Sequence, residues 1–139
     1  MKTALLVLCV LGAVLGDKSV RIVGRLTCHG HPEQFAEIRV WDATWLLPDP
    51  EVGSAVFTDP SGYFEFSGSI NKKSVDPYVY IYHRCYAKPF EIKGRCWNMF
   101  RMEVPQIFVT DGELPTRTWD LKDVKLDEPK ARVNENEKC

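Results

Sequence analysis

The sequence predicts an all-β protein, a two-sheet antiparallel sandwich with at most one short helix. Two observations predict the sandwich: apolar and polar residues alternate in about eight short segments, and turn residues separate these segments every 8–12 residues or so. The chain has 139 residues, enough for one domain. Its formal net charge of -1 provides no basic field for a nucleic-acid partner, and 45% hydrophobic residues exclude compositional disorder.

The first 16 residues have the layout of a secretory signal peptide. A positive start precedes an apolar run over residues 4–11, and small residues lead to Gly16, where cleavage is expected. This run is shorter than the ~20 residues of a transmembrane helix, so an uncleaved anchor is the less favoured alternative. No other segment is apolar enough to span a bilayer. We predict a secreted, extracellular domain over residues 17–126 and a charged C-terminal tail over 127–139.

The first strands are expected over residues 20–28 and 37–42. In the first, every second residue is apolar, and these residues share one face. In the second, Ile38 and Val40 face inward. A longer loop follows, and residues 55–58 and 63–66 then flank Asp59-Pro60-Ser61-Gly62, whose proline and glycine suit a four-residue hairpin turn.

Four further strands complete the expected sandwich. Residues 78–85 have the strongest β-branched and aromatic content, and residues 97–104 alternate. Short strands are expected over 107–109 and 118–126, with a bulge near Asp120–Asp123, where the alternation is irregular. The one candidate helix is weak and covers residues 88–93. Without apolar periodicity, the tail over 127–139 is expected to be mobile unless Cys139 anchors it.

The cysteine positions predict a disulfide across the core. Cys9 lies in the expected signal peptide, which leaves an even number of cysteines in an exported chain and three possible connectivities. Cys28 and Cys85 each lie in phase with the inward residues of their strands, so they are favoured as a pair. Cys96 and Cys139 would then pair by default and hold the tail.

Four ordered motifs resemble the nematode transthyretin-like family. They are Val23-Gly24-x-Leu26-x-Cys28-x-Gly30-x-Pro32, Thr58-Asp59-x-x-Gly62-x-Phe64-x-Phe66-x-Gly68-Ser69, Asp76-Pro77-x-x-x-Ile81-Tyr82-His83-x-Cys85 and Val104-Pro105-x-x-x-Val109-x-x-Gly112-x-x-Pro115-x-x-x-Trp119-Asp120. The resemblance implies a secreted sandwich of the transthyretin, or prealbumin, type with seven or eight strands, and no settled activity. Trp45-Leu46-Leu47, and Lys122 where the family often has glycine, depart from the pattern.

The sequence does not predict an enzyme or a cofactor. Enzymatic relatives of transthyretin end in Tyr-Arg-Gly-Ser, whereas this chain ends in Asn136-Glu137-Lys138-Cys139. A Gly-x-Ser-x-Gly nucleophile motif and a glycine-rich phosphate loop are absent from the sequence.

The three histidines are weak candidates for a metal site. If Cys28 and Cys85 are bonded, His29, His31 and His83 lie at one rim of the sandwich, where imidazoles suit zinc or copper. The favoured alternative makes His83 a hydrogen-bonded core residue and the other two ordinary loop residues.

The stronger candidate is a partner-binding patch on the outer face of one sheet. In the topology that the resemblance implies, three neighbouring strands carry its residues, which are Arg39, Trp41, Tyr78, Tyr80, Tyr82, Arg84, Met99 and Arg101, with Trp97 and Glu103 beside them. Aromatic, methionine and arginine side chains are enriched at interfaces. The alternative is that these aromatic pairs only stabilise the sheet, or that the tail covers them.

These observations predict a secreted binding protein with an extracellular receptor, lipid or glycan as its partner. It would recognise the partner through this face, for example by bridging a surface molecule to a receptor. The arginines Arg39, Arg84 and Arg101 make anionic lipid one conceivable target. The alternative function is a carrier of a small apolar ligand in a channel between subunits, as in transthyretin itself, which requires a tetramer.

Overall fold

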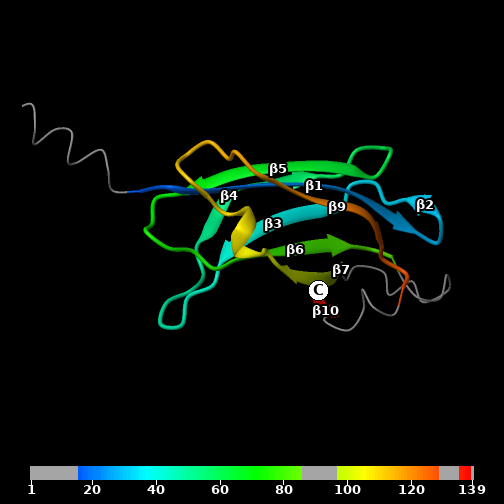
Figure 1. The fold of residues 1–139 in the computed structure, drawn as a ribbon. Coiled ribbons are helices and arrows are strands. Elements are labelled where there is room, and N and C mark those ends of the chain that lie inside the picture. Colours follow the sequence, from blue (N-terminus) through cyan, green and yellow to red (C-terminus); the bar gives the residue numbers. More distant parts are fainter. Residues whose placement is uncertain (1–15, 86–96, 129–134, 139) are drawn as a thin grey trace, which may run out of the picture.

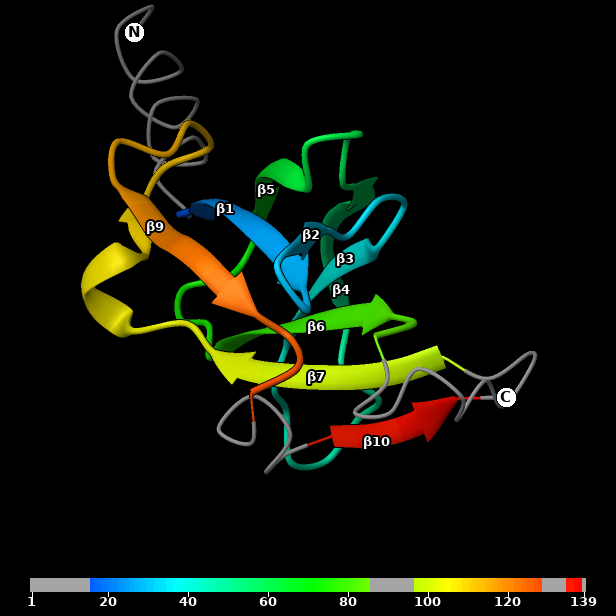
Figure 2. The same cartoon turned by 90° about the vertical axis from the view of Figure 1, so that its right-hand side faces the viewer.

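The protein folds as two β-sheets packed face to face, as the sequence predicted. The computed structural model describes residues 16–85, 97–128 and 135–138. Figure 1 shows the two layers edge-on, and Figure 2 shows the same layers after a quarter turn. We call them the β1 sheet and the β6 sheet.

The β1 sheet is built around the N-terminal strand β1. Its strands are β1 (Lys18–Cys28), β2 (His31–Pro32), β5 (Tyr63–Ile70), β8 (Thr110–Asp111) and β9 (Thr118–Lys125). β2, β5 and β8 pair with β1 antiparallel, whereas β9 pairs with it in parallel. The register between β1 and β9 shifts between Val23 and Arg25, and Lys122 has a φ of 56°. The predicted bulge is therefore present, and it occupies a left-handed conformation that favours glycine.

The β6 sheet has the strand order β10-β7-β6-β3-β4, and every pair in it is antiparallel. Its strands are β3 (Glu37–Asp42), β4 (Glu51–Phe57), β6 (Pro77–His83), β7 (Trp97–Glu103) and β10 (Glu135–Lys138). Strand β10 lies within residues 127–139, the expected tail, so part of that segment is a strand. It supplies the edge strand beside β7 (Figure 2).

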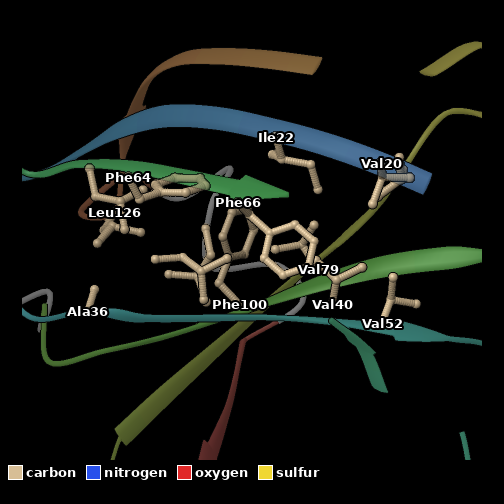
Figure 3. Packing of buried hydrophobic residues seen from close by; sticks show 14 of the residues in the cluster. Val20, Ile22, Ala36, Val40, Val52, Phe64, Phe66, Val79, Phe100 and Leu126 are labelled. Carbon is tan, nitrogen blue, oxygen red and sulfur yellow. The ribbon is translucent and has the colours of Figure 1, made fainter. Parts of the chain in front are cut away.

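The core fills the space between the sheets with the residues whose alternation predicted the strands. Figure 3 shows Ile22 of β1 and Phe66 of β5 above Val40 and Val79 of the β6 sheet. All four side chains have an exposed fraction of 0%. Close packing of this kind is what period-two alternation on both sheets produces.

The disulfide between Cys28 and Cys85 joins the two sheets, as predicted, with 5.6 Å between its Cα atoms. Cys28 ends β1, and Cys85 follows β6 by two residues. The expected pair of Cys96 and Cys139, the candidate helix over 88–93 and nearly all of the expected signal peptide lie outside the described residues.

Two local predictions were wrong. The turn from Asp59 to Gly62 forms, but it connects β4 to β5, which belong to different sheets, so it is not a hairpin between paired strands. The strand expected over 107–109 is a 3-10 helix, η1 (Gln106–Phe108). Pro105 precedes it with a φ of -61°, and its carbonyl accepts the Phe108 N–H at 2.9 Å, which closes a tight turn in place of strand pairing.

Candidate binding face

The outer face of the β6 sheet carries the predicted patch as three rows that cross β3, β6 and β7. The register gives the rows Trp41–Tyr78–Glu103, Arg39–Tyr80–Arg101 and Glu37–Tyr82–Met99. Each row alternates along the strands with core residues such as Val79 and Ile81, so the pleat directs the two sets to opposite sides. We call these nine residues, together with Glu51, Arg84 and Trp97, the binding face.

The aromatic rings of the face contact one another and two arginines. The Tyr78 and Tyr80 rings meet edge to face with 5.4 Å between centroids, and Tyr80 and Tyr82 are 5.9 Å apart. The Arg101 guanidinium lies 3.8 Å from the centre of the Tyr78 ring, and that of Arg84 lies 4.2 Å from the Trp97 ring. Such cation–π contacts fix the planes of the guanidinium groups.

Two arginines of the face, Arg39 and Arg101, are paired with glutamates. Arg39 forms ion pairs with Glu37 and with Glu51, the latter with 2.8 Å between Nη1 and Oε1. Arg101 forms an ion pair with Glu103 at 2.8 Å. The hydrogen bond to Glu37 raises the pKa of the Arg39 guanidinium above its ordinary value. The three arginines of the face are matched in number by three glutamates, so their formal charges cancel.

Tyr78 and Tyr82 are not exposed, contrary to the prediction for this face. Their exposed fractions are 5% and 7%. Arg101 covers the ring of Tyr78, whose hydroxyl donates a hydrogen bond to Asp49 in the loop between β3 and β4. Burial, together with this hydrogen bond, raises the pKa of Tyr78 well above its ordinary value. Burial likewise raises the pKa of Tyr82.

The part of the face open to a partner is therefore narrower than the sequence predicted. Trp41, Tyr80 and Met99 are half-buried, and the side chains of Arg39 and Arg101 are 33% and 37% exposed. Trp97 is half-buried, and Arg84 is exposed at the end of the same face. The accessible centre is the row Arg39–Tyr80–Arg101.

The structure separates the three histidines by environment. His83 is completely buried, and its Nδ1 accepts the Cys85 N–H at 3.0 Å. His29 is exposed, with a φ of 50°, and its N–H donates to Asp127 at 2.9 Å. His31 is exposed on the two-residue strand β2.

The potential metal ligands come together differently from the prediction. Within the described part of the chain, the sole group of three with ligand atoms within 4.8 Å of one another is Cys28, His29 and Cys85. Cys28 and Cys85 form the disulfide, so neither can supply the thiolate that would bind a metal ion. His29, His31 and His83 are therefore not assembled as a set of ligands.

Sequence reasoning named Glu103 but missed the other acidic residues that organise the face, Glu37, Glu51 and Asp49. Glu37 lies two residues before Arg39 on the same side of β3, a spacing that predicts a neighbouring charge on one face. Glu51 and Asp49 carry no comparable signal, because their contacts depend on how the loop after β3 folds back onto the sheet.

The fold and this face define a small, disulfide-linked β-sandwich with an organised outer surface. Residues 23–105 match the transthyretin-like family, and the chain belongs to that family. Its relatives in Caenorhabditis elegans include transthyretin-like protein 1, 26% identical over 88% of this chain and 80% of its own. Transthyretin-like protein 2 is 26% identical over 90% of both chains, and transthyretin-like protein 46 is 25% identical over 91% of this chain and 70% of its own.

Among solved structures, the fold aligns with part of a crystal structure of a 9R-lipoxygenase from Cyanothece. The TM-score is 0.45 at 17% identity, and the alignment covers 80% of this chain and 17% of that one. None of the described residues forms a helix long and apolar enough to cross a membrane.

Proposed function

We propose that this chain is a secreted, non-enzymatic binding protein that recognises an extracellular protein partner through the binding face. The observation that carries the proposal is the row Arg39–Tyr80–Arg101, in which an aromatic ring lies between two half-exposed arginines. Tyrosine, tryptophan and arginine are the residues most enriched among those that dominate binding energy at protein interfaces.

The side chains of this row are held in place before any partner arrives. Arg39 is fixed by Glu37 and Glu51, and Arg101 by Glu103 and the Tyr78 ring. Ordering a flexible side chain on binding costs about 0.5–1.5 kcal/mol, and a preorganised side chain avoids most of that cost. These ion pairs therefore lower the entropic cost of binding a partner.

The charge balance of the face favours a protein partner over anionic lipid. A surface that attracts phosphate headgroups needs unpaired cations, whereas Arg39 and Arg101 are each paired with carboxylates. A protein surface with charges of both signs matches a face of this kind. Binding to anionic vesicles is therefore an outcome that would redirect the proposal.

The extracellular setting is supported by the disulfide between Cys28 and Cys85. Structural disulfides form and persist in oxidising compartments. The signal-peptide layout of residues 1–16 agrees with export.

The test is capture of partners from extracellular fluid, followed by affinity measurement with the captured protein. The double variant Trp41→Ala, Tyr80→Ala should weaken binding about 30-fold or more, the effect of losing ~2 kcal/mol at the centre of an interface. Tyr63→Ala is the matched control, because Tyr63 is 38% exposed on the other sheet. Equal affinity for the double variant and the wild type, both folded, would refute the proposal. A tetramer in light scattering would instead favour a carrier with a channel between subunits.

A further inference from the structure

The loop between β3 and β4 presents three consecutive large apolar side chains to solvent. Trp45, Leu46 and Leu47 are 90%, 73% and 73% exposed. Single exposed apolar residues are ordinary, but contiguous ones mark interaction sites on soluble domains. We call these three residues the apolar tip.

The base of this loop is tied by hydrogen bonds. The Asp42 N–H donates to the Pro50 carbonyl at 2.9 Å, which closes the loop across its ends. Inside the loop, Thr44 donates its N–H to Asp49 Oδ1 at 2.8 Å and its hydroxyl to the Leu47 carbonyl. The apolar tip is therefore held outward by a polar base.

Other loops at the same end of the sandwich extend this surface. An open hollow of about 390 Å³ separates the apolar tip from the loop between β5 and β6, where Lys72, Ser74 and Asp76 line its polar wall. The helix η1 contacts that loop, because the Gln106 side-chain amide donates a hydrogen bond to the Val75 carbonyl at 2.7 Å, and the next residue of η1, Ile107, is 64% exposed. This end of the sandwich therefore has exposed apolar side chains next to polar ones, which is the arrangement of a surface that binds at a lipid–water interface.

The charges at this end do not favour anionic lipid. In the two segments that border the hollow, residues 42–50 and 71–76, the basic residues are Lys72 and Lys73 and the acidic residues are Asp42, Asp49 and Asp76. Lys72 is moreover paired with Asp42. Because acidic residues outnumber basic ones, attraction to this end must come from burial of apolar surface.

We propose that the apolar tip inserts into the interfacial region of a neutral, zwitterionic lipid surface. Tryptophan is enriched at membrane interfaces, where its ring lies at the level of the headgroups. Tryptophan is common to both kinds of interface, but leucine, which supplies two of the three residues, is under-represented among the residues that dominate protein–protein interfaces, so the set favours lipid over a protein groove. The tip lies in the loop between β3 and β4, outside the rows of the binding face, so this inference does not depend on the proposed function.

Sedimentation of the purified protein with phosphatidylcholine vesicles tests the inference. The triple variant Trp45→Ser, Leu46→Ser, Leu47→Ser should lower the constant for partitioning onto the vesicles by about tenfold or more, because interfacial affinity follows the apolar area that is buried. Phe57→Ser is the matched control, since Phe57 is 57% exposed near the opposite end and should leave partitioning within about twofold of the wild type. Phosphatidylserine in the vesicles should add less than about twofold.

A second measurement keeps the test independent of the triple variant. Brominated phosphatidylcholine should quench tryptophan fluorescence in the wild type, and Trp45→Phe should abolish most of the quenching while retaining vesicle binding. The inference is overturned if the wild type does not sediment with neutral vesicles, or if the folded triple variant sediments equally well. It is also overturned if only anionic vesicles bind, which would assign lipid to the arginines of the binding face. A dimer that depends on the tip, without vesicle binding, would assign the tip to a second copy of the chain.

Discussion

Replacing Gly62 with alanine is expected to lower the free energy of unfolding by about 3 kcal/mol. Gly62 has a φ of 80°, and a Cβ built on it would lie 2.3 Å from the carbonyl oxygen of Leu26 in β1. That oxygen accepts the Glu33 N–H at 2.9 Å, and the Gly62 carbonyl accepts the Leu26 N–H at 2.8 Å. A methyl group at this position must push the inter-sheet turn away from β1.

The magnitude follows from two contributions. An alanine in the left-handed region costs about 1 kcal/mol. Two strained or broken backbone hydrogen bonds at about 1 kcal/mol each supply the rest. Gly30 separates the two contributions, because its φ is 81° and open space surrounds its Cβ position. Gly30→Ala should therefore cost only the first contribution.

The assay is urea unfolding of both variants, with the free energies extrapolated to water. Comparable slopes for the two variants would show that the same surface is exposed on unfolding. If Gly62→Ala and Gly30→Ala agree within about 0.5 kcal/mol, the close packing of the turn on β1 contributes nothing and the reasoning fails.

The disulfide and the buried tyrosine give two further predictions. Removing the disulfide with Cys28→Ala and Cys85→Ala should lower the free energy of unfolding by about 4 kcal/mol, which is the chain-entropy value for a separation of 57 residues. A loss below about 1 kcal/mol in urea unfolding would contradict the stabilising role of this bond between the sheets. The raised pKa of Tyr78 means that the folded state keeps its proton after the unfolded state has lost it, so stability should fall as the pH rises above 10. Tyr78→Phe should flatten the fall of stability with pH, as measured by unfolding across pH. It should also return the lowered pKa of Asp49 toward its ordinary value, as measured by NMR titration of the carboxylate. An unchanged fall of stability at alkaline pH would show that Tyr78 does not cause it.

The strands of the core could be predicted because most of their apolar residues alternate with polar ones. Cys28 continues the inward phase of its strand and Cys85 continues that of its own strand, and these two phases together favoured the pair that the structure confirms. The irregular phase before Asp123 likewise predicted a bulge that the register confirms. Period-two patterns carry this information because each strand must place one side against the other sheet.

The connections could not be predicted so well, because identical turn chemistry serves different topologies. The proline and glycine between Asp59 and Gly62 close a tight turn whether the next strand pairs with the last or crosses to the other sheet. Nothing local distinguishes these outcomes. The choice depends on Tyr63 and the residues after it pairing with β1, a contact distant in sequence.

The composition of the binding face could be predicted, but its exposure could not. Alternation placed Tyr78 on the outer side of β6, and the register confirms that side. Its burial depends on Asp49 and Arg101 reaching the ring from two other elements. A period-two pattern reports which side a residue takes and not which other side chains cover it.

The parallel pairing of β1 with β9 determines the order in which the sheet can be completed. Arg21 lies opposite Thr118, so the first strand to be synthesised has its neighbour near the far end of the chain. During synthesis β1 can pair with β5, but the N–H and C=O groups of its other edge stay without a strand partner until the later strands, chiefly β9, emerge. During most of its synthesis the nascent chain therefore exposes a strand edge that could pair with another chain. Closing that edge is the last step in the assembly of this layer and a consequence of topology that single contacts do not reveal.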